Sequence, residues 1–189
     1  MKGVPLISPL PNPPPLGEGA NLLPPAGGGR EGGAGTVIIG MGNPLLSDDG
    51  VGIAVAYAVA ERLKQRINLT VTELHTGGIR LMEAMAGFRR AVVVDAMLSG
   101  AIPGTLRHFN SMDFVTTKNT FSSHDTNFAT AFDLGRMAGV LLPKQVSFWG
   151  IEAREFDLFA EQFTDEVAAA LPGAVERIAA EILQWEGAE

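Results

Sequence analysis

The 189-residue sequence contains no cysteine. Disulfides, thiolate metal sites and a cysteine nucleophile are therefore excluded. Any bound metal has to be held by histidine, aspartate, glutamate or backbone oxygen atoms.

Long apolar runs and an excess of positive charge are also missing. The apolar run from Val51 to Ala60 is too short for a membrane span, which needs about 20 residues. With 14 Lys and Arg against 21 Asp and Glu, the net charge is −7, which argues against binding to phosphate backbones. No signal-peptide pattern opens the chain. We therefore expect a cytoplasmic protein with no nucleic-acid or membrane partner.

The first 35 residues differ in composition from the rest of the chain. They are rich in proline and glycine, as in residues 11–15 and 27–29, and cannot build a packed core. We expect a disordered tail over residues 1–35, dispensable for activity, and one globular domain over residues 36–189. A proline-rich ligand for a partner domain is the alternative interpretation of the tail.

After the tail, apolar runs typical of strands alternate with helical patterns. Strands are expected at residues 36–41, 69–74, 91–96, 105–109 and 146–151, and helices at 49–65, 78–88, 125–139 and 165–186. Residues 110–124 are expected to form a polar loop, and Pro172 to divide the last helix in two. This order predicts a three-layer α/β/α fold with a mostly parallel twisted sheet and helices on both faces.

Three polar residues follow or end predicted elements at one edge of this sheet. Asp49 follows the first strand, Asp95 ends the third, and His124 closes the polar loop. Ligands of open α/β sheets bind at the carboxyl ends of the strands. Two carboxylates and an imidazole suit a divalent transition metal, or equally an acid–base set without metal.

Structural interpretations compete with the functional ones. Asp48 is expected to cap the following helix. The role of Asp49 could be limited to a favourable interaction between its charge and the positive N-terminal end of that helix. His124 could belong to an ordinary helix start. Asp95 follows three valines, so its charge is expected to be buried. An unpaired buried charge is costly, and a functional role is therefore favoured for Asp95 over a structural one.

Three further polar residues leave the choice more open. His75 follows the second predicted strand and either joins the site or packs beside it. His108 lies within a short strand and is expected to be structural. Glu152 ends the last strand, where a structural role is favoured over lining the site.

The glycine turn at residues 40–44 admits two other families. Gly40 and Gly42 lack the third glycine of a dinucleotide fingerprint, because position 45 is leucine, and the acids that follow would repel a pyrophosphate. The turn also resembles the opening of peptidyl-tRNA hydrolase. The acidic stretch at residues 47–50 and the negative net charge disfavour that esterase.

The motif Gly40-Met41-Gly42-Asn43-x4-Asp48-Asp49-Gly50-x-Gly52 resembles the opening of the hydrogenase maturation proteases. The resemblance runs from about Val37 to Ala180, through Asp95 and His124. It implies an endopeptidase that removes the C-terminal tail of a nickel-loaded [NiFe]-hydrogenase large-subunit precursor. It also implies that Asp49, Asp95 and His124 hold the metal, which the substrate carries in, and we expect the protein to be a monomer.

Two departures from the family pattern bear on substrate choice. The family's Asp-Gly-Gly-Thr stretch appears here as residues 73–78, which include His75, and its first metal-binding acid, often glutamate, is Asp49. A non-cleaving chaperone that senses nickel would need the same ligands. That function remains the main alternative to a protease.

Overall fold

The computed structural model describes residues 35–67, 69–110 and 128–187. These residues form a five-stranded sheet in the order β2-β1-β3-β5-β4. Its strands are β1 (Thr36–Met41), β2 (Leu69–Leu74), β3 (Arg90–Met97), β4 (Leu106–Asn110) and β5 (Gln145–Glu152). Pairing is parallel throughout except between β4 and β5. The mostly parallel sheet predicted from the sequence is confirmed.

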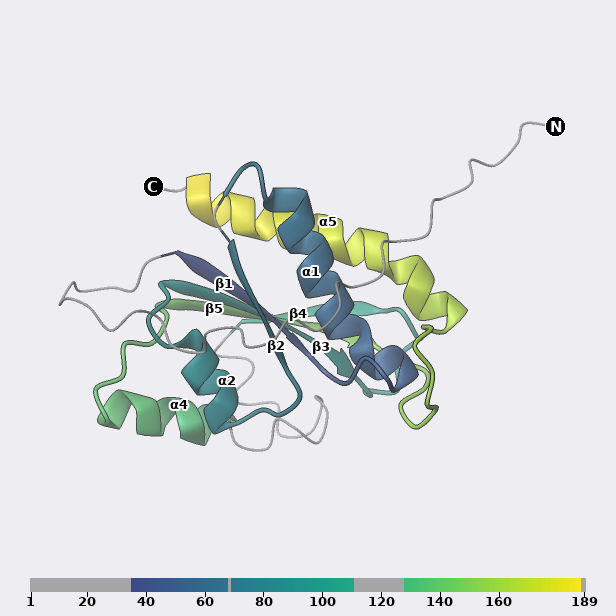
Figure 1. Ribbon diagram of the computed structural model, residues 1–189, viewed down its shortest axis with the longest axis horizontal. Helices are drawn as coiled ribbons and strands as arrows, with labels where there is room; N and C mark the ends of the chain where they lie inside the picture. The colour runs from purple at the N-terminus through teal and green to yellow at the C-terminus, as the bar shows by residue number, and fades with distance from the viewer. Residues whose placement is uncertain (1–34, 68, 111–127, 188–189) are drawn as a thin grey trace.

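Helices cover both faces of the sheet, as predicted for a three-layer fold. They are α1 (Val51–Leu63), α2 (Ile79–Met85), α4 (Phe128–Met137) and α5 (Asp165–Gly187), with a 3-10 helix η1 (Ser47–Gly50) before α1. Figure 1 shows α1 and α5 side by side over one face, and α2 and α4 over the other. No helix within the described ranges is long and apolar enough to cross a membrane.

The central strands β1 and β3 are buried along their whole length. Ile38 and Val92 join the apolar core under α1 and α5, whereas Val37 and Val93 join the second core under α2 and α4. A strand with both faces covered needs apolar residues at consecutive positions, which explains the unbroken apolar runs in the sequence.

Helix α5 corrects one prediction, because it continues through Pro172 instead of breaking there. Proline removes one helical hydrogen bond. However, Leu171 and Ala174, on either side of it, are both buried in the core under α1 and α5. A straight helix keeps this apolar stripe on the sheet, and the exposed Pro172 is tolerated.

Other boundaries shift by a few residues from those predicted. Helix α2 ends at Met85, short of residue 88, because Ala86 is extended, with φ −60° and ψ 133°, and Gly87 then takes a positive φ of 82°. Residues 1–34 of the tail expected over residues 1–35, most of the polar loop and the first turn of the helix expected from residue 125 lie outside the described residues. Those expectations stay predictions.

The strand order creates a switch point between β1 and β3. From β1 the chain crosses through α1 to β2 on one side, and then returns through α2 to β3 on the other. The two crossovers cover opposite faces of the sheet (Figure 1), and the connections that leave β1 and β3 run in opposite directions from their carboxyl ends. Ligands of doubly wound sheets bind at such a point.

Glycines allow the first residues of α1 to pack directly against the backbone at the ends of β1 and β3. A Cβ atom on Gly52 would lie 2.4 Å from the carbonyl oxygen of Val94 and 2.5 Å from that of Met41. A Cβ atom on Gly40 would lie 2.5 Å from the Cα of Ile53. All three distances are below any normal contact, so the start of α1 can reach the ends of β1 and β3 only because these positions lack side chains.

We expect Gly52→Ala to lower the free energy of unfolding by about 1–3 kcal/mol, since the added methyl forces the helix away from two backbone carbonyls. The matched control is Gly173→Ala in α5, where a Cβ would meet nothing within 4 Å. That substitution should stabilise by up to about 1 kcal/mol through helix propensity. Urea denaturation measures both. A Gly52→Ala variant as stable as the parent would contradict the close packing.

Candidate functional site

Acidic side chains are buried at the carboxyl edge of the sheet. Among the described residues, the buried acids are Asp48, Asp49, Asp95 and Glu152, all at or beyond the ends of β1, β3 or β5. The buried cation Arg90 lies at the opposite edge, where it pairs with Glu186 at 2.7 Å. Negative charge is therefore concentrated at the switch point.

Asp48 does not cap a helix, and the predicted cap is wrong. No side chain caps η1 or α1. The Asp48 carboxylate instead accepts hydrogen bonds from the backbone N–H groups of Arg154 (2.9 Å), Glu155 (3.1 Å) and Thr164 (2.8 Å), and from the Thr164 hydroxyl (2.9 Å). This fully buried carboxylate joins η1 to the strap, which we define as residues 153–164 between β5 and α5.

Further hydrogen bonds hold the strap beside the turn after β1. Ser47 donates its N–H to the Ala160 carbonyl at 2.7 Å, and Ala160 donates its N–H to the Leu45 carbonyl at 3.1 Å. Ser47 also donates its hydroxyl to the Gln162 carbonyl at 3.0 Å and adopts a positive φ of 47°, rare for a residue other than glycine. Hydrogen bonds to the strap thus hold in place the backbone that precedes Asp49.

Glu152 has a comparable structural role, as the sequence favoured. Its carboxylate accepts hydrogen bonds from the N–H groups of Ser99 (2.8 Å), Gly100 (2.8 Å) and Ala101 (3.1 Å), and from the Ser99 hydroxyl (2.6 Å). The loop that follows β3 is therefore anchored to the end of β5.

Asp49 is presented by η1 directly above the end of β1. Its Oδ2 accepts a hydrogen bond from the Asn43 N–H at 2.7 Å. Gly42 adopts a φ of 124°, and a Cβ there would lie 1.8 Å from the backbone oxygen of Asp49. The Gly40-Met41-Gly42 turn seen in the sequence is therefore required for Asp49 to reach this position.

Asp95 lies within β3, one residue beyond the pairing of β3 with β1. Its neighbour on β5 is Gly150, and the last β1–β3 pair is Gly40 with Val94. Its side chain is 1% exposed, and Oδ1 accepts a hydrogen bond from the Ala96 N–H at 2.9 Å. Strand β3 continues to Met97, so Asp95 does not end it as predicted, although it lies just beyond the last residue of β3 that pairs with β1.

His124 lies outside the described residues, so its approach to the two aspartates stays a prediction. Within the ranges that the structure does describe, no three acidic, cysteine or histidine side chains are grouped to hold a metal.

The other two histidines are placed clearly. His75 Nδ1 lies 2.7 Å from the Gly42 carbonyl oxygen, so the ring adjoins the turn that supports Asp49. His108 stacks on Trp149 with ring centroids 4.4 Å apart, and its Nε2 lies 3.1 Å from Glu181. The structural role expected for His108 is confirmed.

Tyr57, which contacts Glu73 of β2, has a shifted pKa. Burial raises the pKa of Tyr57, and the nearby Glu73 carboxylate, 3.4 Å from its hydroxyl, adds to the increase. Tyr57 in α1 therefore stays neutral around pH 7 and donates to Glu73.

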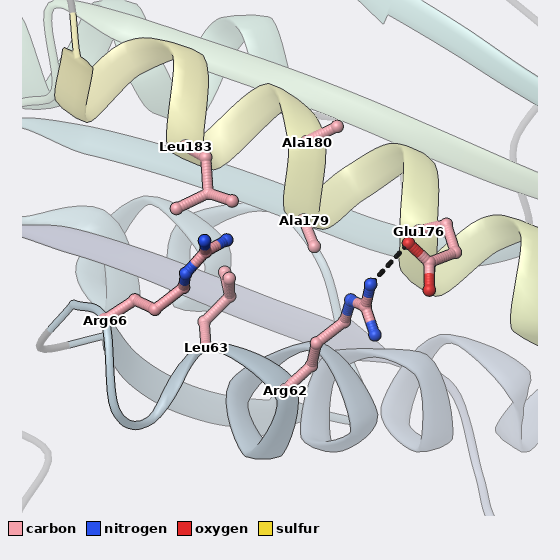
Figure 2. A pocket seen from close by; sticks show the side chains of 7 residues that line it. All are labelled: Arg62, Leu63, Arg66, Glu176, Ala179, Ala180 and Leu183. Atoms are coloured by element: carbon pink, nitrogen blue, oxygen red, sulfur yellow. Dashed lines mark hydrogen bonds and ion pairs between the residues drawn. The ribbon is translucent and has the colours of Figure 1, made fainter.

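Two surface hollows are lined mostly by helical residues, and neither lining includes Asp49 or Asp95. One, of about 250 Å³, lies between the C-terminal end of α1 and α5, where Arg62 pairs with Glu176 at 2.6 Å (Figure 2). The end of α1 is at the amino edge of the sheet, opposite the aspartates. The second hollow, of about 290 Å³, lies between the start of α2 and α4.

Comparison with known proteins identifies the class of this fold and site. The hydrogenase maturation protease family model matches residues 53–181. The chain belongs to the hydrogenase maturation protease family, and it is a peptidase. The matched range includes Asp95 and His124 and begins four residues after Asp49.

Individual relatives agree with this assignment. The chain is 27% identical over 154 residues to the hydrogenase expression/formation protein HoxM of Cupriavidus necator, covering 80% of this chain and 75% of HoxM. The solved [NiFe] hydrogenase maturation protease HybD of Thermococcus kodakarensis superposes with a TM-score of 0.62 at 32% identity, over 78% of this chain and 97% of that one. The endopeptidase HybD of Escherichia coli has the same fold, with a TM-score of 0.64 at 24% identity over 79% and 92% of the two chains.

We expect Asp48→Asn to lower the free energy of unfolding by about 1–3 kcal/mol, because an amide NH₂ then faces buried N–H donors that lose their acceptor. Asp157→Asn, an exposed aspartate of the same strap, is the matched control and should change little. The midpoints of urea denaturation of the two variants measure this difference in stability. Equal midpoints would show that Asp48 does not hold the strap.

Proposed function

We propose that the protein removes the C-terminal tail of a [NiFe]-hydrogenase large-subunit precursor after nickel has been inserted. Membership of the maturation protease family supports this proposal. The single structural observation that carries it is the burial of Asp49 and Asp95 at the switch point of the sheet. The carboxyl ends of strands at a switch point are where the ligands of doubly wound sheets bind.

The proposed ligands are Asp49, Asp95 and His124, and the nickel ion arrives as part of the substrate. Two carboxylates and an imidazole fit a divalent transition metal that keeps positions open for other ligands. Such an ion polarises a carbonyl or lowers the pKa of a water molecule, either of which promotes amide hydrolysis. The protein contributes fixed anionic oxygens, and a cysteine nucleophile is excluded by the composition.

The precursor itself is proposed to dock on apolar side chains around the site. Leu45, Leu98, Ile102, Leu158 and Phe159 are exposed and belong to the loops after β1, β3 and β5. We call these five residues the apolar rim. Asp48 and Glu152 hold those same loops, so the rim is presented on a fixed frame. Exposed apolar groups around a site mark an interface with another protein.

The remaining parts of the proposal concern partners and location. The negative net charge of −7 supports a protein substrate over nucleic acid. We propose that a monomer acts in the cytoplasm. A non-cleaving chaperone that senses nickel could use the same carboxylates, but membership of a peptidase family favours cleavage.

Incubation with purified precursor distinguishes the two functions. The nickel-loaded precursor should lose its tail, seen as a mass decrease, whereas nickel-free precursor should stay intact. Binding of loaded precursor without any mass change would establish the chaperone instead. Equal cleavage of both forms would overturn the role of nickel in recognition.

We expect Asp95→Asn to reduce tail cleavage by at least about 100-fold without loss of fold, because the side chain keeps its size but loses the anionic oxygen. Asp133→Asn, the same change at an exposed site on α4, should leave cleavage unaffected. Mass spectrometry of the precursor and circular dichroism of each variant give the answer. If the two variants cleave equally, Asp95 is no ligand.

Replacing Phe159 by serine should raise KM for the precursor by about tenfold while kcat is retained, since losing an apolar anchor costs about 1–2 kcal/mol of binding. Phe159 is 76% exposed, so its removal leaves the core intact. Met137→Ser on α4, at 84% exposure, is the control away from the rim. An unchanged KM for Phe159→Ser would place the docking surface elsewhere.

A further inference from the structure

The peptide unit that joins Gly42 to Asn43 is held from both sides by side chains. Its carbonyl oxygen lies 2.7 Å from Nδ1 of His75. Its N–H donates to Oδ2 of Asp49 at 2.7 Å. One peptide therefore connects an imidazole that follows β2 to the aspartate that follows β1.

The chemistry of this contact fixes the state of the ring. A carbonyl oxygen only accepts hydrogen bonds, so Nδ1 of His75 carries the proton that it donates to Gly42. The C=O and N–H bonds of a trans peptide point in opposite directions. His75 Nδ1 and Asp49 Oδ2 thus lie on opposite sides of the peptide, and they do not meet at one metal ion.

The path of the chain after β2 places residue 75 within hydrogen-bonding distance of the Gly42 carbonyl oxygen. Gly42 donates its own N–H to the Leu74 carbonyl at 3.1 Å, which ties the turn to the end of β2. The next residue, His75, then reaches back to the Gly42 oxygen. A carboxylate at position 75 could only accept and would repel this oxygen, so histidine suits the position chemically.

We propose that His75 is a positioning residue for Asp49, acting through the Gly42–Asn43 peptide. A donor on the carbonyl polarises the peptide and strengthens its N–H as a donor to the carboxylate. Asp49 Oδ2 is thereby held in one orientation, as the partners of metal-ligating carboxylates generally hold them. This inference rests on the proposed function, because it assigns to His75 the orientation of a proposed nickel ligand.

Two near-isosteric variants separate the two ring nitrogens. In His75→Asn the amide NH₂ takes the place of Nδ1, whereas in His75→Gln it takes the place of Nε2. The first variant keeps the donor to Gly42 and the second loses it. His75→Ala removes both, and the exposure of His75 allows all three variants to fold.

The first measurement is the amide proton shift of Asn43 by NMR in the protein alone. We expect the shift of the parent to be kept in His75→Asn and to move upfield in His75→Gln and His75→Ala. The second measurement is cleavage of nickel-loaded precursor. There, kcat should fall about tenfold in the Gln and Ala variants, with KM unchanged, and stay near the parent value in His75→Asn.

Three results would overturn the proposal. They are an Asn43 shift unmoved in His75→Ala, parental kcat in His75→Gln, and loss of cleavage in His75→Asn, which would mean that Nε2 itself acts. The NMR experiment needs no precursor. If the parent protein cut no precursor, the proposed function would fail, while the Asn43 shift would still decide whether His75 holds the peptide.

Discussion

The start of α1 packs against the ends of β1 and β3 with no side chain between them, and the site depends on this contact. Gly52 lies against the carbonyl groups of both strands, and Gly42 lies against the backbone of Asp49. A methyl group at either position would collide with backbone atoms and force these segments apart. The glycines thus fix the distance between the helix that follows Asp49 and the strand that holds Asp95.

Carboxylates at the same sheet edge serve two different purposes. Asp48 and Glu152 each accept several backbone N–H groups from loops distant in sequence, and so act as loop anchors. Asp49 and Asp95 accept backbone N–H groups from their own turn and strand. The anchors hold the frame in which the other two aspartates are displayed, and the charge of all four is kept at one end of the molecule.

Much of the fold was predictable because it depends on local patterns. Unbroken apolar runs indicated buried strands, their alternation with helices indicated a parallel sheet, and the Gly40-Met41-Gly42 turn indicated a strand that delivers Asp49 to an edge. The family resemblance, which rests on the same motif, is confirmed.

What failed depended on contacts between distant residues. Asp48 precedes a helix and has the residue type of a cap, and nothing nearby in the sequence signals Arg154 or Thr164 as its partners. A proline such as Pro172 usually ends a helix. Here the helix continues, because Leu171 and Ala174 are both buried in the same core. The bond from His75 to Gly42 was equally invisible, since it spans two strands.

The bonds of Asp48 also make the site depend on distant parts of the chain. Its partner Thr164 lies 116 positions further along the chain. The strands β1, β2 and β3 come early in the chain, whereas the groups that donate to the Asp48 carboxylate all belong to the strap. These contacts join the segment after β1 to the segment after β5, which lies two strands away in the sheet. The frame around the site therefore needs segments from both ends of the domain, and a chain shortened before Thr164 would lack donors that hold Asp48.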